Sequence, residues 1–313
     1  MRVLAPLWVT TIPFGIASNI TNIVVFLKTG AKDNVTILLL SLAISDLFFL
    51  ILASPHRCVF IMRSIGLPYT RSVDLSIPYR LFYWPAFTAY DLSVFISVSL
   101  GLMRCACVAM PLKFKHVFTR SRTVKWVMFL VVLAVSLRLP VLTIHRLSWR
   151  IDPTTNKTVP YVKVVNRPTM LQINDLLNRI SVLYLSYCIL ITCVGVLTYK
   201  LFQAAKTRRD CLQTSQTSDQ QTLSSKDLKV VKSVVLVCSI FVLLQLPALV
   251  TSTTRLIVPE FNIGKDLVLL FAIMNQINFT CVYLNASINI FVYYSYNSKY
   301  RTVFRSLIGQ SDK

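Results

Sequence analysis

Seven apolar stretches, separated by short gaps, constrain this chain more than any other feature of its sequence. A helix needs about 20 apolar residues to cross the hydrocarbon core of a bilayer. Lipid offers no partners for backbone polar groups, so a spanning segment must be helical or part of a closed barrel. The sequence therefore predicts an all-α membrane protein, with one domain over residues 1–313. Its seven transmembrane helices are expected at about 5–28, 35–62, 79–110, 124–145, 174–203, 229–257 and 266–294.

The composition indicates that the chain contacts lipid and argues against nucleic acid as its partner. Hydrophobic residues make up 55% of the chain and charged residues only 14%, whereas a soluble domain carries about a quarter charged residues. The net charge of +21 could indicate nucleic-acid binding, but the basic residues lie between the apolar stretches and not on one periodic face. We therefore predict a lipid bilayer as a partner and no nucleic acid.

Basic residues in the short gaps predict the orientation of the bundle. More than half of the 33 lysines and arginines lie in segments that are inside if the N-terminus is outside, as the positive-inside rule requires. The expected location is the plasma membrane. One alternative is a cleaved secretory signal ending near Ala17. The polar segment 204–226 is expected to be a flexible inner loop, either a linker or a phosphorylation-controlled contact.

Polar side chains inside the apolar stretches are the candidate functional residues. Arg104 lies at the end of the third stretch. Because a guanidinium keeps its charge at ordinary pH, Arg104 needs a polar partner or water at this position. Asp46 must be neutral, paired or ion-bound in such a place. Asn285 and Asn289 are four residues apart and share one helical face. With the Ser93 hydroxyl, these groups offer oxygen atoms to a hard cation or to water.

Short motifs follow one another in a fixed order along these stretches. They are Ser18-Asn19, Leu-Ala-Ile-Ser-Asp-Leu at 42–47, Met103-Arg104-Cys105 followed by Pro111-Leu112, Phe241 six residues before Pro247, Asn289-Ile290-Phe291-Val292-Tyr293, and Tyr300-Arg301. In order and spacing the chain resembles rhodopsin-like (class A) G-protein-coupled receptors over nearly its whole length. The resemblance also implies a short amphipathic helix along the membrane surface at about 297–308.

This resemblance implies a function and roles for residues. The chain would bind an extracellular ligand, a peptide or a small chemosensory molecule, in the outer half of the bundle and activate a heterotrimeric G protein. Arg104 would contact the G protein on activation, Tyr293 would swing towards Arg104, and Phe241 with Pro247 would form the pivot of the sixth span. Asp227 is a candidate restraint on Arg104; the alternative for Asp227 is a solvated charge at a helix N-terminus.

The resemblance also implies an interior sodium site. Its residues would be Asp46, Ser93, Asn285 and Asn289, and sodium would act as an allosteric ligand. We expect no other cofactor and no enzymatic activity, because the three histidines show no metal-ligand spacing and no nucleophile elbow or phosphate loop is present.

Four positions depart from the family pattern. Met103 replaces the acidic neighbour of the arginine, and Cys105 replaces the tyrosine after it. Gln245 stands where many members have a switch tryptophan. Ile290 replaces the proline of the last span, which predicts the loss of one kink. These replacements resemble a divergent invertebrate, molluscan-type branch of chemosensory and peptide-receptor-like proteins.

The outer loop between the fourth and fifth spans is expected to form a short hairpin. Residues 147–151 alternate in polarity, residues 152–155 have turn chemistry, and residues 159–164 follow as a second strand. Cysteines are missing from 79–86 and from 145–175, so the disulfide that usually ties this loop to the third span is not available. Asn156 begins an exposed glycosylation sequon, Asn-Lys-Thr.

No dedicated ligand motif can be recognised, but two polar residues and the surface charge are candidates. Asp91 and Gln245 are the candidate ligand-binding residues; Asp91 would pair with a ligand amine or with a polar group of another span. Basic residues outnumber acidic ones on the predicted outer side, which favours an acidic ligand. The basic residues are Arg57, Arg63, Arg71, Arg80, Arg146, Arg150, Lys157, Lys163 and Arg167, and the acidic ones are Asp74, Asp152, Asp175, Glu260 and Asp266.

Two other functions remain open at this point. A seven-span channel or transporter would need an ionisable path and corresponding interrupted helices in two halves, and no internal repeat is visible. A receptor-like protein that has lost G-protein coupling would be consistent with Met103 and Gln245.

Overall fold

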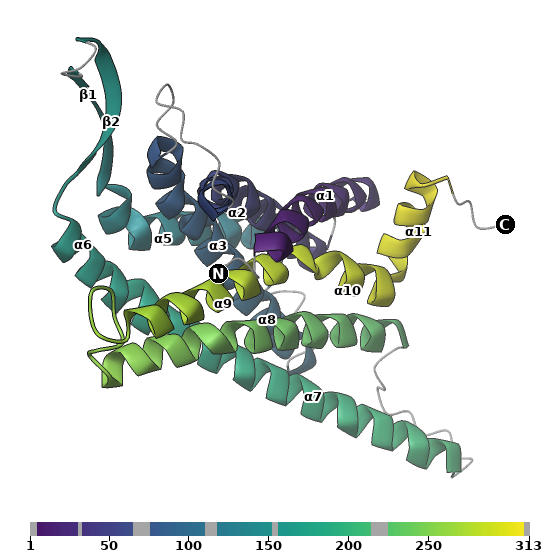
Figure 1. Ribbon diagram of the computed structural model, residues 1–313. Coiled ribbons are helices and arrows are strands. Elements are labelled where there is room, and N and C mark those ends of the chain that lie inside the picture. The colour runs from purple at the N-terminus through teal and green to yellow at the C-terminus, as the bar shows by residue number, and fades with distance from the viewer. Residues whose placement is uncertain are drawn as a thin grey trace.

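The computed structural model describes residues 5–30, 33–64, 76–109, 118–151, 156–213 and 225–309, and these form a helical bundle with one small sheet (Figure 1). The elements, in chain order, are α1 (Ala5–Thr29), α2 (Asn34–Ser64), α3 (Ser76–Ala109), α5 (Arg120–Leu142), β1 (His145–Ile151), β2 (Thr158–Val164), α6 (Arg167–Asn174), η1 (Asp175–Val182), α7 (Leu183–Gln213), α8 (Ser225–Ile257), α9 (Val268–Ser287), α10 (Asn289–Tyr296) and α11 (Ser298–Leu307).

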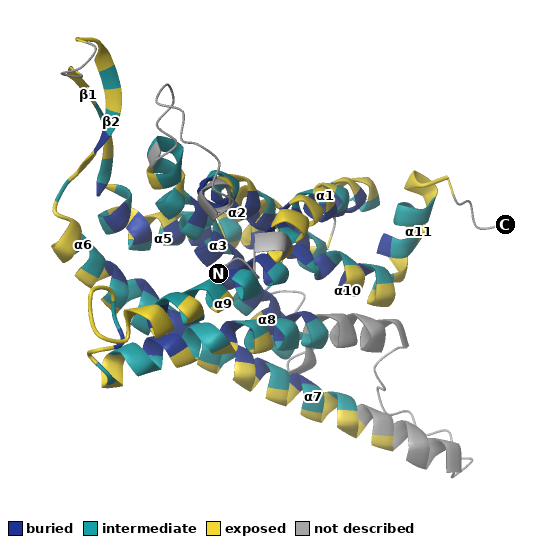
Figure 2. Cartoon of the chain, in the orientation of Figure 1, coloured by how far each residue is buried: buried dark blue, intermediate teal, exposed yellow. Residues whose placement is uncertain are grey.

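Seven helical segments of the described chain are long and apolar enough to cross a membrane. Large apolar side chains such as Phe48, Val132 and Leu243 lie exposed on their outer sides, where lipid replaces water as the solvent. Buried residues line the inside of the bundle and exposed ones lie around it (Figure 2). The predicted seven-transmembrane bundle is confirmed, and the chain is a multi-pass membrane protein.

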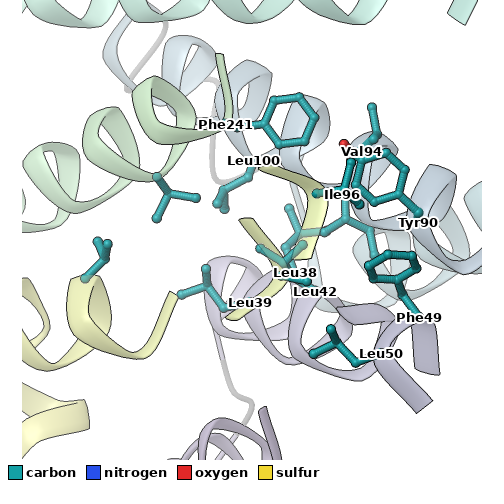
Figure 3. Close-up of a cluster of buried hydrophobic side chains, with 14 of the residues drawn as sticks. Leu38, Leu39, Leu42, Phe49, Leu50, Tyr90, Val94, Ile96, Leu100 and Phe241 are labelled. Carbon is teal, nitrogen blue, oxygen red and sulfur yellow. The ribbon is translucent and has the colours of Figure 1, made fainter. Parts of the chain in front are cut away.

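The helix α3 is central, since it packs against α2, α5, α7 and α8. The core between these helices is apolar: Phe241 of α8, Leu100 of α3 and Leu38 and Leu42 of α2 belong to one cluster of buried side chains (Figure 3). Each of these four side chains is almost fully buried. Because lipid is as apolar as leucine, close van der Waals packing and hydrogen bonds hold such helices together more than exclusion from water does.

The fifth span begins earlier than predicted and contains a π-helix. Pro168, expected in a gap, instead lies in the first turn of α6, where its missing N–H is not needed. The α6 helix then runs into η1, eight residues whose hydrogen bonds skip one extra residue. At the other end, α7 continues to Gln213, so the first half of the predicted flexible segment 204–226 is helical; residues 214–224 lie outside the described chain.

The prediction that Ile290 removes a kink from the last span is wrong. The span breaks at Ile288, between α9 and α10. Two side chains of α1 occupy the carbonyls at the break: Asn19 Nδ2 donates to the Ala286 carbonyl at 2.7 Å and Ser18 Oγ donates to the Ser287 carbonyl at 3.0 Å. Side chains inserted into the helical ladder kink a helix without proline.

The predicted hairpin is present as β1 and β2, which pair antiparallel from His145 opposite Val164 to Ile151 opposite Thr158. It projects from the bundle beside the end of α5, whereas α11 lies at the opposite end (Figure 1). We call these the hairpin end and the α11 end. The predicted turn residues 152–155 lie outside the described chain.

The hairpin is tied to the third span through its first residue. The ring nitrogen Nδ1 of His145 lies 2.9 Å from the carbonyl oxygen of Arg80 on α3. Burial lowers the pKa of the His145 imidazole below its usual value, and this backbone contact opposes the shift only in part. The imidazole therefore stays neutral at ordinary pH.

Candidate functional site

A cavity of about 770 Å³ opens into the bundle at the hairpin end. Residues of α2, α3, α5, α6, η1, α7, α8 and α9 line it, together with His145 and Val164 of the hairpin. Aromatic side chains, among them Tyr83, Phe87 and Phe279, form one wall, and polar groups converge on the rest. Cavities of this size and mixed lining are typical of small-molecule sites.

The predicted ligand-binding residue Asp91 lies on the cavity wall, but its charge is already balanced. Arg138 of α5 donates to it through Nε and through Nη2, the second bond at 2.8 Å. Arg138 also donates through Nη1 to Asn174 Oδ1 at 2.8 Å. Asp91 and Arg138 are 5% and 8% exposed, so the structure favours pairing with another span over pairing with a ligand amine.

The other predicted ligand-binding residue, Gln245, lines the cavity too and is bonded across the bundle. Tyr90 of α3 donates its hydroxyl to Gln245 Oε1 at 2.6 Å. Both side chains are buried. Gln245 lies two residues before Pro247, inside α8, so this bond joins α3 to α8 near the point where proline weakens the helix.

A second cluster of charges lies where η1 meets α8. Asp175, the first residue of η1, is 3.2 Å from Arg255 Nη2 and 3.5 Å from Arg179 Nη1. Arg255 Nη2 also donates to Asn262 Oδ1 at 3.1 Å. One carboxylate is therefore shared between two guanidinium groups, both of which line the cavity.

The assignment of Arg57 to the outer basic surface is wrong, because Arg57 is 1% exposed. Its guanidinium carbon lies 4.3 Å from the ring centre of Trp8 and 4.0 Å from that of Phe279. It donates to Tyr283 Oη at 2.8 Å and to Gln276 Oε1 at 2.9 Å. Cation–π contacts and hydrogen bonds thus replace its hydration.

Of the other charged residues predicted for the outer surface, some are exposed and some line the cavity. Arg146, Arg150 and Lys163 are exposed on the hairpin. Asp175 belongs to the cavity instead. The side chains of Arg63, Arg71, Asp74 and Asp152 lie outside the described residues.

Three of the four residues predicted to hold sodium meet in the bundle interior. Asp46 of α2 accepts hydrogen bonds from Ser93 Oγ at 2.6 Å and from Asn289 Nδ2 at 3.0 Å. Asn285 is buried one turn before Asn289, and within the described chain it makes no hydrogen bond to Asp46. The carboxylate and hydroxyl oxygens are hard ligands that fit sodium, whereas the Asn289 amide presents its nitrogen to Asp46.

The predicted switch residues lie towards the α11 end. Tyr293 is 1% exposed and packs edge-to-face against Phe26, with ring centres 5.2 Å apart. Phe241 is 2% exposed in the apolar core, and Arg104 is partly buried at the end of α3. Asp227 lies in the first turn of α8, and its side chain is outside the described part of the structure. Its contact with Arg104 stays a prediction.

The helix after the last span, α11, is anchored to α1. Asn297 caps it by accepting from the Tyr300 backbone N–H at 3.1 Å, and Tyr300 Oη donates to Asn22 Oδ1 at 2.6 Å. Burial raises the pKa of the Tyr300 hydroxyl, so it remains a donor. This places α11 on the residues predicted for the surface helix.

A family model described as "Serpentine type 7TM GPCR chemoreceptor Srw" matches residues 9–311. The chain belongs to the Srw family of chemoreceptors. The match includes all seven spans and α11, and it confirms the prediction of a G-protein-coupled receptor type of protein and its chemosensory character. A search of curated proteins found no match. The rhodopsin-like class, the molluscan-type branch and a peptide ligand stay predictions.

In this Srw receptor, the sequence interpretation missed Arg138 although the signal was present. Arg138 interrupts an apolar span just as Arg104 does, and an ionisable residue within a span is a functional candidate by default. Arg255 and Asp175 were harder to recognise, because they lie near span ends, where charges are common.

The predicted glycosylation site of the Srw receptor is sterically open. Asn156 is exposed at the tip of the hairpin and has a φ of 52°, a left-handed conformation that asparagine tolerates better than most residues. Glycosylation of Asn156 stays a prediction.

Proposed function

We propose that this Srw receptor lies in the plasma membrane with its N-terminus and hairpin end outside, binds an extracellular ligand in the cavity and activates a heterotrimeric G protein at the α11 end. The observation that carries this proposal is the cavity of about 770 Å³ at the hairpin end, lined by both aromatic and charged side chains. Such a lining excludes water from part of a ligand and orients the rest by hydrogen bonds.

A ligand in this cavity would act on α8 through Gln245. Along α3 the cavity lining runs from Tyr79 to Val94, so Tyr90 and Gln245 lie near its inner end. A ligand that breaks or replaces the Tyr90–Gln245 bond changes the tie between α3 and α8 beside Pro247. A ligand shifts a two-state equilibrium only if it binds the two states with different affinity. The Tyr90–Gln245 bond would be present in one conformation of the receptor and broken in the other, so a ligand that competes for it would favour the second.

Arg104 would contact the G protein from the α11 end. Its neighbour Met103 is 2% exposed and belongs to the apolar core. An acidic residue at 103 would therefore bury a carboxylate among apolar side chains, which is costly. Restraint of Arg104 would fall to Asp227, and without that contact the receptor should show raised basal activity.

Sodium would act as an allosteric ligand at Asp46. Asp46 Oδ atoms and Ser93 Oγ would bind the ion, and Asn289 would join them if its amide turned its oxygen inwards. The ion would balance the buried carboxylate and so stabilise one arrangement of α2, α3 and α10.

The test is nucleotide exchange on a panel of purified heterotrimeric G proteins, with the receptor in lipid nanodiscs and a library of chemosensory compounds. The proposal expects at least one compound to raise GTP binding, and Arg104→Ala to abolish the response while the compound still stabilises the receptor against heat. Arg150→Ala, an exposed arginine of β1 at the hairpin end, is the matched control. Ligand-gated conductance without exchange would favour a channel, and binding without exchange on any G protein would favour a receptor that has lost coupling.

A further inference from the structure

The charged groups on the cavity wall do not balance. Among the described residues, those that line the cavity include more guanidinium than carboxylate groups: Arg80, Arg138, Arg167, Arg179 and Arg255 against Asp91 and Asp175. Arg138 and Asp91 neutralise each other. Asp175 then has to serve both Arg179 and Arg255, so the cluster between η1 and α8 carries one surplus positive charge.

Arg255 is the less exposed of the two arginines in this cluster. Its side chain is 16% exposed, against 38% for Arg179. Its Nη2 reaches Asp175 and Asn262, while its Nε is buried and has no hydrogen-bond partner among the described residues. The ring of Phe271 lies 5.5 Å from the guanidinium carbon. A buried donor without an acceptor is costly, and a second acceptor beside Arg255 would remove that cost.

The chemistry of the cluster is suited to binding a carboxylate. Guanidinium groups bind carboxylates through charge-assisted hydrogen bonds, often in pairs. The positive surplus attracts an anion and repels a cation, and in a cavity with low-dielectric walls this attraction is less screened than at the surface. The aromatic wall of Tyr83, Phe87 and Phe279 suits an apolar or aromatic body on the same molecule.

We propose that Arg255, supported by Arg179, is the anion-binding subsite of this receptor, and that its ligands are organic acids with a carboxylate and an apolar or aromatic body. This inference rests on the proposed function in using the same cavity, but it concerns binding and not coupling. Asp175 holds Arg255 in place and also competes with the ligand for it, so Asp175 sets the affinity.

Asp175 allows the subsite to be distinguished from a purely structural tie between η1 and α8. If Arg255 only held the two helices together, removing either partner would weaken the fold and any binding. If Arg255 binds the carboxylate of a ligand, Arg255→Gln abolishes that binding, whereas Asp175→Asn strengthens it. The two variants then act in opposite directions.

The experiment uses the full-length receptor in nanodiscs and pairs of probes that differ only in charge. These are 3-phenylpropionate, indole-3-acetate and decanoate, each compared with its primary carboxamide, and binding is followed by thermal shift and by competition calorimetry. We expect at least one carboxylate to bind at least about tenfold more tightly than its amide. We expect Arg255→Gln to remove that preference and Asp175→Asn to raise affinity for the acid about tenfold. Arg146→Gln, on the exposed part of β1, removes the same charge and should leave the preference unchanged.

Three results would overturn the subsite. These are binding of no carboxylate in the panel, equal binding of acid and amide, or weaker acid binding in Asp175→Asn. If Arg255→Gln does not fold, the affinity of Asp175→Asn for the carboxylate probes alone decides between the subsite and a structural tie. Failure of the proposed function looks different: a carboxylate binds through Arg255 but no G protein exchanges nucleotide. Exchange driven by neutral or cationic compounds and unchanged in Arg255→Gln would uphold the receptor and reject the acid.

Discussion

The Asp91–Arg138 pair should dominate the stability of the outer half of the bundle, and a double-mutant cycle measures this directly. Arg138 donates two hydrogen bonds to Asp91 and one to Asn174, and both residues are buried, with exposed fractions of 8% and 5%. Arg138→Met leaves the carboxylate of Asp91 buried without its counter-charge, which costs about 3–5 kcal/mol. Asp91→Leu leaves the guanidinium with only Asn174 and should cost a similar amount.

The double variant Asp91→Leu/Arg138→Met buries no unpaired charge and should be much less destabilised than the sum of the two single changes. The expected coupling energy is about 3 kcal/mol or more, because replacing a buried ion pair by apolar residues is often close to neutral. The assay is reversible unfolding in mixed micelles with increasing denaturing detergent, followed by tryptophan fluorescence. Arg150→Met, an exposed cation on the hairpin, serves as control. Additive single effects, within about 0.5 kcal/mol, would refute the reasoning.

Three further outcomes can be checked on the same preparation. Sodium in place of a bulky organic cation should raise the thermal midpoint of the wild type but not of Asp46→Asn; equal midpoints in both cations would reject the sodium site. Gly15→Ala should destabilise the bundle by about 1–3 kcal/mol, measured by the same unfolding assay, because an added Cβ would lie 2.2 Å from Ser287 Oγ; wild-type stability would contradict this close packing. Tyr90→Phe should raise basal nucleotide exchange several-fold by removing the bond to Gln245, and an unchanged basal rate would show that this bond does not restrain α8.

Much of the fold could be predicted because the bilayer imposes a simple rule on the sequence. A spanning helix must be apolar over a fixed length, so the seven spans could be recognised from composition and length alone. The hairpin was equally local, since alternation and turn residues specify it within about twenty residues. Asp46, Ser93 and Asn289 were grouped by resemblance, and the structure places both Ser93 and Asn289 within hydrogen-bond distance of Asp46.

Contacts between distant segments could not be predicted in this way. The periodicity of a helical sequence shows on which face of its own helix a residue lies. It does not show which other helix that residue contacts. Arg57 was placed on the outer surface from its position near a span end, whereas Trp8, Phe279 and Tyr283 enclose it. The break at Ile288 arises because Asn19, more than 260 residues away, takes a carbonyl from the helical ladder.

The sequence by itself determined that the chain crosses the membrane seven times and which segments do so, because lipid solvation acts on each segment separately. The tertiary structure alone decided which charges are balanced. It pairs Asp91 with Arg138 across 47 residues and leaves Asp175 shared between Arg179 and Arg255. The energy of a buried charge depends on the groups within a few ångströms of it, and those groups come together only when the helices pack.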